Sequence, residues 1–77
     1  MNRSVNGWSI AHIAAVEKDV NGVTTKVTLE HADARLNGVD FTAVNSLKMA
    51  QPGWTYALRF RKGSIIDDRI LQEDLSR

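Results

Sequence analysis

Hydrophobic and polar residues alternate on both sides of an Asn21-Gly22 dipeptide. An Asn-Gly pair favours a two-residue type I′ turn, because both residues tolerate positive φ and the turn twists in the same sense as the flanking strands. Folding the chain back about this turn gives an antiparallel hairpin with one mainly apolar and one mainly polar face. The central pairs of the apolar face are Val16 with Val27, Ala14 with Leu29, and His12 with His31.

This register leaves two apolar residues, Ile13 and Ala15, on the polar face of the hairpin. A helix over residues 9–18 is the alternative for the first segment, since Ser9 suits an N-cap and the apolar spacing also fits a helical face. We favour a strand, because residues 24–31 alternate clearly and need a partner strand.

A second dipeptide of the same kind, Asn37-Gly38, predicts another tight hairpin. It implies one long strand over residues 23–36 and a short strand over residues 39–44. Within the long strand the apolar positions change from odd to even residue numbers. A bulge or bend is therefore expected at residues 31–33.

The Pro52-Gly53 dipeptide has type II turn chemistry, because proline fixes φ at the second turn position and glycine accepts positive φ at the third. After this turn the chain alternates as a strand, with large aromatic and aliphatic side chains on one face. Those core-facing residues are Trp54, Tyr56, Leu58 and Phe60.

The segment after this strand predicts a last hairpin. A three-residue loop with Gly63 in the left-handed position keeps Asp67 out of the core and leaves Ile65 among the arginines of the opposite face. A helix over residues 64–75 also fits the apolar spacing. We expect a strand to about Leu71, followed by a short polar tail or a single helical turn.

Five strands joined by tight turns, with no long helix, predict an all-β domain: a small five-stranded, mostly antiparallel barrel of the SH3-like or OB-like kind. The order of the later elements resembles SH3-like barrels in general, and such a resemblance indicates a fold and not a function. At 77 residues the chain is expected to form a single domain, with residues 1–6 frayed.

Composition limits the function classes. Ten lysines and arginines against nine aspartates and glutamates give a net charge of +1, which argues against a strongly electrostatic nucleic-acid binder. The lack of cysteine excludes a disulfide, a thiolate zinc site and a cysteine nucleophile, and it fits a reducing, cytoplasmic location. The sequence shows no signal peptide or membrane span, and it indicates no cofactor or small-molecule substrate.

The predicted first hairpin brings His12 and His31 side by side, with their Cβ atoms roughly 4.5–5.5 Å apart. Two imidazoles at that distance can bind a divalent metal, with Asp33 as a third ligand on the same face. Closed structural zinc sites use four ligands, so we expect these histidines to end the hairpin without a metal.

Four cations lie in or after the aromatic strand. They are Arg59, Arg61, Lys62 and Arg69. Together with the aromatic residues they resemble, in composition, a surface that binds single-stranded nucleic acid. The alternation weakens this interpretation, because Arg59 and Arg61 point away from the aromatic face and Asp67 offers them a counter-charge. Nucleic-acid binding is therefore the alternative function.

An enzyme is a weaker interpretation. Asp67 and Asp68 are neighbours in a strand, so their carboxylates project to opposite faces and cannot share a substrate. The sequence has no nucleophile elbow and no glycine-rich phosphate loop. We therefore expect a protein without enzymatic activity.

Three apolar residues, Ile13, Ala15 and Ile65, have no place in the predicted core. If the sheet brings them together, they form a patch for a partner protein or for a second copy of the chain. We therefore predict a protein-binding module, such as an adaptor or an inhibitor of a larger complex. On this interpretation Ile13→Glu abolishes self-association or partner capture and leaves the fold intact.

Overall fold

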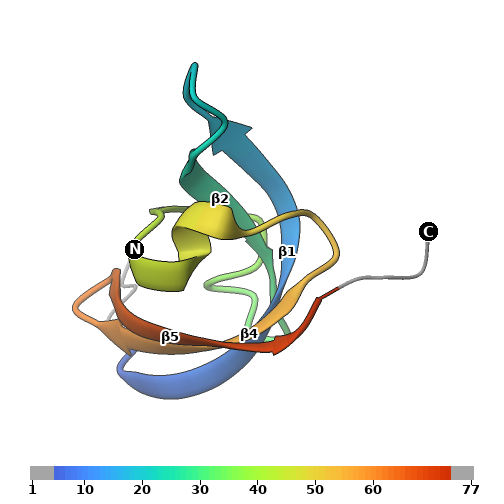
Figure 1. Cartoon of the computed structure of the whole chain (residues 1–77). Coiled ribbons are helices and arrows are strands. Elements are labelled where there is room, and N and C mark those ends of the chain that lie inside the picture. The colour runs from blue at the N-terminus through green and yellow to red at the C-terminus, as the bar shows by residue number, and fades with distance from the viewer. Residues whose placement is uncertain (1–4, 74–77) are drawn as a thin grey trace.

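A computed structural model of the chain describes residues 5–73. These residues form one antiparallel sheet with the strand order β3-β2-β1-β4-β5. Figure 1 shows its curvature and labels β1, β2, β4 and β5. The elements are β1 (Gly7–Lys18), β2 (Thr24–Glu30), β3 (Asp40–Thr42), the 3₁₀ helix η1 (Asn45–Met49), β4 (Thr55–Arg61) and β5 (Ser64–Gln72). The predicted all-β, antiparallel architecture is confirmed, and both helical alternatives are wrong over the residues that the structure describes.

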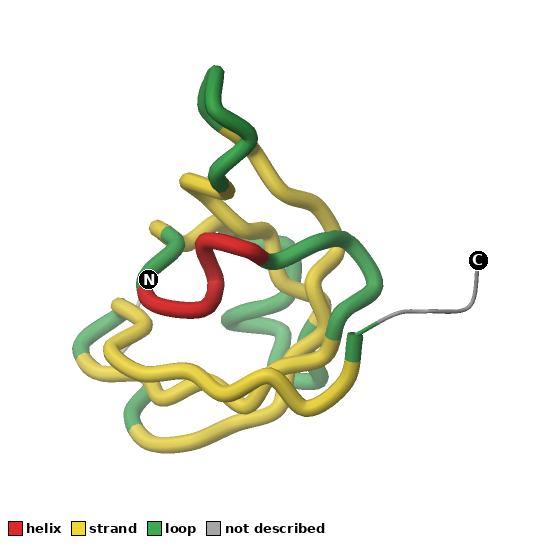
Figure 2. The backbone as a smooth tube through the Cα atoms, in the orientation of Figure 1, coloured by secondary structure: helices red, strands yellow, loops and turns green. Residues whose placement is uncertain are grey.

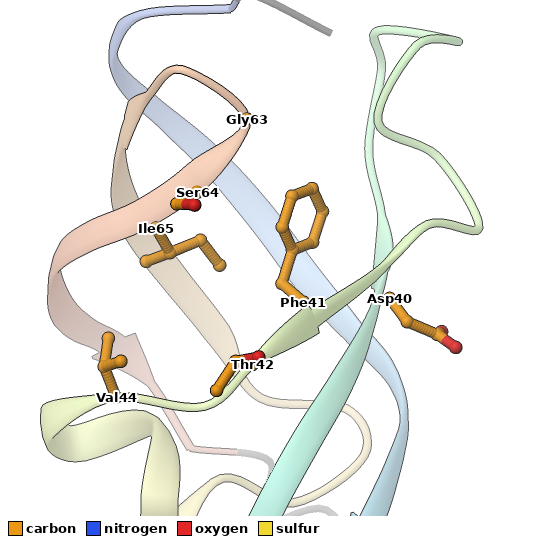
Figure 3. A pocket seen from close by; sticks show the side chains of 7 residues that line it. All are labelled: Asp40, Phe41, Thr42, Val44, Gly63, Ser64 and Ile65. Carbon is orange, nitrogen blue, oxygen red and sulfur yellow. The ribbon is translucent and has the colours of Figure 1, made fainter.

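The sheet curls until its two edge strands, β3 and β5, approach each other, with some Cα atoms less than 8 Å apart. No ladder joins these edges in residues 5–73, so the sheet does not close into a barrel. A further strand between them would need two strand spacings, about 9.5 Å in total, which is more than the edges allow where they approach. Side chains line the gap instead, because Phe41 and Ile65 face it from the two sides and both are buried (Figure 3).

The core lies on the concave side of the sheet, where η1 packs between β2 and β5 (Figure 2). The hydroxyl of Tyr56 donates a hydrogen bond to the carbonyl oxygen of Ser46 at 3.0 Å. Burial raises the pKa of Tyr56 to about 12, so the phenol stays a neutral donor that anchors η1. The buried hydrophobic residues are Ala11, Ile13, Val27, Leu29, Leu36, Phe41, Ala43, Leu47, Ala50, Tyr56, Leu58, Phe60 and Ile65.

The first hairpin forms as predicted, but its loop has three residues and not two. Gly22 has a φ of 82°, its N–H donates to the carbonyl oxygen of Asp19 at 3.0 Å, and the Asp19 N–H donates to the carbonyl oxygen of Val23 at 2.9 Å. This is a type I turn completed by a left-handed glycine. The Asp19 carboxylate favours the longer loop, because its Oδ1 accepts the N–H groups of Asn21 and Val23 at 2.9 and 3.0 Å.

A bulge at Ala14 changes which face of β1 is buried. In the middle of the hairpin the predicted register holds, and Val16 faces Val27. Ala14 is then an extra residue in β1, and the residues before it lie on the opposite faces from those predicted. Ile13 therefore enters the core with 2% of its surface exposed, whereas His12 points to solvent. The bulge buries the more hydrophobic of these two side chains, which is the physical reason for the difference.

The predicted long strand over residues 23–36 is wrong beyond Glu30, where β2 ends. The carbonyl oxygen of Asp33 accepts the N–H groups of Leu36 and Asn37 at 2.9 and 3.0 Å, so the chain winds into a turn. This turn places Leu36 fully inside the core, which an extended chain would not achieve together with Leu29.

An ion pair stabilises this turn and gives it a pH dependence. The Arg35 guanidinium donates to both carboxylate oxygens of Asp33 and lowers the pKa of that carboxyl from 3.8 to about 2. Because the folded-state pKa is depressed, the stabilisation is complete above pH 3.8 and is lost as the pH falls through about 2. We expect the melting temperature of wild type to fall more steeply over this range than that of Asp33→Asn, as measured by circular dichroism. Equal slopes for the two proteins would contradict this assignment.

The last hairpin is tighter than predicted. Lys62 and Gly63 form a two-residue loop with φ values of 52° and 81°, as a type I′ turn requires. This loop places Ile65 across from the core residue Phe60, so Ile65 turns into the core with 6% of its surface exposed, and a bulge at Ile66 follows. Asp68 is therefore the aspartate that lies across from the core residue Leu58. Its charge is not left unpaired, because its Oδ2 accepts the N–H of Leu47 at 2.9 Å.

Two further predictions concern chain segments next to this sheet. The Pro52-Gly53 turn is confirmed, since Gly53 has a φ of 94° and the Trp54 N–H donates to the carbonyl oxygen of Gln51 at 3.2 Å. Val5, which belongs to the segment expected to be frayed, packs against the core. The tail predicted after Leu71 begins later, because Gln72 still belongs to β5. Residues 1–4 and 74–77 lie outside the described residues.

Candidate functional site

The predicted protein-binding patch does not exist as an exposed surface. Ile13 and Ile65 lie in the core with 2% and 6% of their surfaces exposed. Ala15 is exposed on the convex face, where it pairs with Thr28 of β2. Two of the three predicted residues are therefore needed for folding and are not available to a partner.

The two histidines are not opposite each other, because the Ala14 bulge places Glu30 across from His12. The Nδ1 atom of His12 lies 2.8 Å from the hydroxyl of Thr55. The Nδ1 atom of His31 accepts the N–H of Asp33 at 2.8 Å, so its proton resides on Nε2, which is hydrogen-bonded to the hydroxyl of Ser9. No group of three His, Asp or Glu residues suited to a metal ion occurs within residues 5–73.

Two large apolar side chains point outward from consecutive convex-face positions of β1. Trp8 has 53% of its surface exposed and Ile10 has 61%. Their cross-strand neighbours on β4 are Arg59 and Ala57. We call these four residues the Trp8–Ile10 patch.

The sequence contained a signal for this patch that the predicted register concealed. Once Ala11 and Ile13 are assigned to the core, the period of two along β1 places Trp8 and Ile10 on the outside. A register without a bulge assigns Ile10 to the apolar face instead. The patch therefore becomes visible only when the bulge is known.

The four predicted nucleic-acid-binding cations lie at one end of the convex face or beside it. Arg59 and Arg61 point outward from β4, Lys62 is in the tight loop, and Arg69 pairs with Ala57 from β5. None of the four forms an ion pair within 4.0 Å among the described residues.

Asp67, the counter-charge expected for these arginines, forms no ion pair with them in residues 5–73. Asp67 is directly across from Arg59 in the β4–β5 register. Its Oδ1 instead accepts the N–H of Asp68 at 2.8 Å. The predicted charge ladder is thus absent from the described part of the chain, and the arginines are available to an external anion.

A shallow hollow of about 280 Å³ adjoins the patch at Arg59. Gly7 lines it with a φ of 98°, and apart from its chain neighbours no atom is within 4 Å of where a Cβ would lie. Arg59, Arg61 and Ile66 form other parts of its lining. The hollow therefore offers an apolar wall beside two guanidinium groups.

Two other hollows are less suited to a ligand. One of about 300 Å³ lies between the sheet edges (Figure 3). The charged residue of its lining, Asp40, points away from the gap and accepts a hydrogen bond from the hydroxyl of Thr28. Another of about 510 Å³ lies beside Ile10 and is lined in part by His31, whose two ring nitrogens are both hydrogen-bonded within the fold.

Comparison of this chain with protein-family models, with curated proteins and with solved structures gives no match. In residues 5–73 no helix combines the length and the hydropathy that a membrane crossing demands. An assignment of function therefore depends on the chemistry of the exposed surface.

Proposed function

We propose that this chain is a non-enzymatic protein-binding module and that its binding surface is the Trp8–Ile10 patch. The observation that carries the proposal is the exposure of Trp8 and Ile10 at consecutive positions on the convex face of β1. The solvent-facing side of an antiparallel sheet is normally polar. The core is complete without these two side chains, so folding does not account for them.

The composition of the patch supports a protein partner. Tryptophan and arginine are enriched at the energetic centres of protein interfaces. In the Trp8–Ile10 patch, Trp8 and Arg59 are cross-strand neighbours. Ile10 and Ala57 add aliphatic surface beside them. The patch is on the outside of a curled sheet, so the partner would supply the concave side of the interface, as expected for an adaptor or an inhibitor of a larger complex.

Catalysis has no comparable support. Asp67 is exposed, whereas the carboxylate of Asp68 is bonded to the backbone of η1. The two carboxylates therefore serve different local roles and do not form a pair that could act on one substrate. A cytoplasmic location stays a prediction from the sequence.

Nucleic-acid binding through Arg59, Arg61, Lys62 and Arg69 is the second candidate. One observation favours it: Trp8 supplies an exposed aromatic ring directly across from Arg59. Surfaces that bind single strands usually stack successive bases on several aromatic side chains. The next outward position here is Ile10, so we rank this function below protein binding.

Removing the two large side chains of the patch tests the proposal. We expect wild type to capture a partner from its native host that then binds the purified chain directly in calorimetry. Truncation of one interface hot spot costs about 2 kcal/mol or more, so Trp8→Ala combined with Ile10→Ser should weaken this binding at least about thirtyfold. Light scattering shows whether the partner is a second copy of the chain.

Val20→Ser is the matched control, because Val20 is fully exposed at the tip of the first hairpin, which projects away from the rest of the molecule in Figure 1. Its affinity should stay within about twofold of wild type, as for other surface changes away from an interface. Undiminished binding by the patch variant would contradict the proposal. Salt-sensitive binding of DNA or RNA that needs Arg59 and Arg61 would favour the second candidate.

A further inference from the structure

We infer that the partner of the Trp8–Ile10 patch presents an acidic segment, in which a large apolar side chain is flanked by carboxylates. The apolar side chain would contact Trp8 and Ile10, and the carboxylates would bind Arg59 and Arg61. This inference rests on the proposed function and names the chemistry of the partner.

Cations outnumber acidic residues around the patch, where Glu30 borders Ile10. Arg59 belongs to the patch, Arg61 and Arg69 project from β4 and β5 near it, and Asp67 is the counter-charge across from Arg59. Other charged residues of this chain do find partners: the Arg35 guanidinium lies 2.7 Å from the Asp33 carboxylate. The cations near the patch have no such contact within residues 5–73. Their complement is an external anion.

Guanidinium groups favour carboxylates as ligands, because the planar group donates two parallel hydrogen bonds to one carboxylate. Arg59 and Arg61 occupy successive outward positions on β4, so they lie about 7 Å apart along the strand. Two carboxylates at alternate positions of an extended segment have a similar spacing. An acidic segment can therefore reach both arginines at once.

The hollow at Gly7 adds a steric reason for the same partner. It adjoins the patch at Arg59, and its lining combines Ile66 with Arg59 and Arg61. Ile66 has 42% of its surface exposed, because the β5 bulge turns it outward. An apolar side chain next to a carboxylate would match this lining.

The exposed aliphatic side chains near the arginines favour a protein segment over a nucleic acid as the partner. Ile10 and Ile66 border the arginines, and both are exposed. A nucleic acid offers phosphates for the arginines but gains little from aliphatic surface, since its bases stack on aromatic rings. An acidic protein segment uses both kinds of side chain.

Selection from a random peptide library of about 12 residues, displayed on phage, tests the inference with the full chain as bait. We expect enriched peptides to combine two or more Asp or Glu residues with a Trp, Phe or Leu. One enriched peptide, made synthetically, should lose about tenfold in affinity with Arg59→Gln and with Arg61→Gln, and should bind more weakly as NaCl rises from about 50 to 300 mM.

Lys48→Gln is the matched control, because it removes the same charge from an exposed position of η1 on the other side of the sheet. Its affinity for the peptide should equal that of wild type. Replacing the acidic residues of the peptide by Lys should abolish binding to wild type, and the double variant Arg59→Glu with Arg61→Glu should restore it.

Other outcomes separate this inference from the proposed function. Enriched neutral or basic peptides that need Trp8 and Ile10 but not the arginines would overturn the acidic partner and leave the proposed function standing. Peptides that bind independently of Trp8 and Ile10 would overturn both. Binding of an oligo(dT) single strand that requires Arg59, with no peptide enriched, would also overturn both and favour a nucleic-acid partner.

Discussion

An Ile13→Glu variant should fail to fold. Ile13 has 2% of its surface exposed and lies among the core residues of β1, β2 and β4. The substitution removes about 1.5–3 kcal/mol of hydrophobic stabilisation, and it either buries a carboxylate or forces the sheet open at an additional cost of several kcal/mol. A chain of this size has a total stability of about 3–5 kcal/mol, so the balance favours the unfolded state.

Far-UV circular dichroism and two-dimensional amide NMR spectra check this expectation. Ala15→Glu is the matched control: Ala15 is two residues away in β1 but exposed, so this variant should keep the wild-type spectrum. The sequence alone predicted a folded Ile13→Glu protein that no longer binds a partner. A dispersed, native-like spectrum for Ile13→Glu would support that earlier interpretation and contradict the structure.

The elements of this fold were largely predictable because period-two alternation and turn chemistry are local signals. The alternation after Pro52-Gly53 identified the buried side of β4 correctly, including Tyr56 and Phe60. Asn21-Gly22 located the first hairpin, and the central pair Val16 with Val27 is present. Each of these features depends on residues within about ten positions of one another.

The registers near the bulges were not predictable in the same way. A bulge adds one residue to one strand, and everything beyond it changes face. At Ala14 and at Ile66 the bulge is selected by what the rest of the sheet can bury. Such a choice depends on tertiary packing, which local patterns do not contain.

The candidate site was affected more than the fold, because site predictions depend on which side of a strand a residue occupies. One extra residue moved Ile13 into the core and moved Ile10 out of it. In the last hairpin, a loop one residue shorter than predicted moved Ile65 inward. The four cations were identified from the sequence, but their aromatic neighbour, Trp8, comes from a strand that is distant in sequence.

The turn after β2 shows a second limit. Asn37-Gly38 is a strong hairpin signal, and Gly38 does have a positive φ of 76°. The turn nevertheless forms part of a longer loop, because Leu36 gains more by entering the core than by pairing in a hairpin. Burial of one leucine can outweigh the preference of a dipeptide.

A Phe60→Ala variant should also be unfolded at 25 °C. The Phe60 ring connects β4 to β3 by side-chain packing, and these two strands share no hydrogen-bonded ladder. Phe60 has 1% of its surface exposed, and its ring meets Phe41 of β3 edge to face at 5.6 Å and His31 at 6.4 Å between ring centroids. Truncating a buried phenylalanine costs about 3–5 kcal/mol, and the lost aromatic pair adds about 0.5–1.5 kcal/mol. The combined cost is as large as or larger than the stability of about 3–5 kcal/mol expected for a domain of this size.

Phe60→Leu separates the aromatic contacts from the volume of the side chain. It keeps most of the buried apolar surface but loses the edge-to-face contact with Phe41. We expect this variant to fold with a lower urea midpoint and an unchanged slope of unfolding free energy against urea. Because β3 and β5 share no ladder, side-chain packing has to hold the edges of the sheet together. A Phe60→Ala protein that unfolds at the wild-type urea concentration would show that the sheet edges hold without this packing.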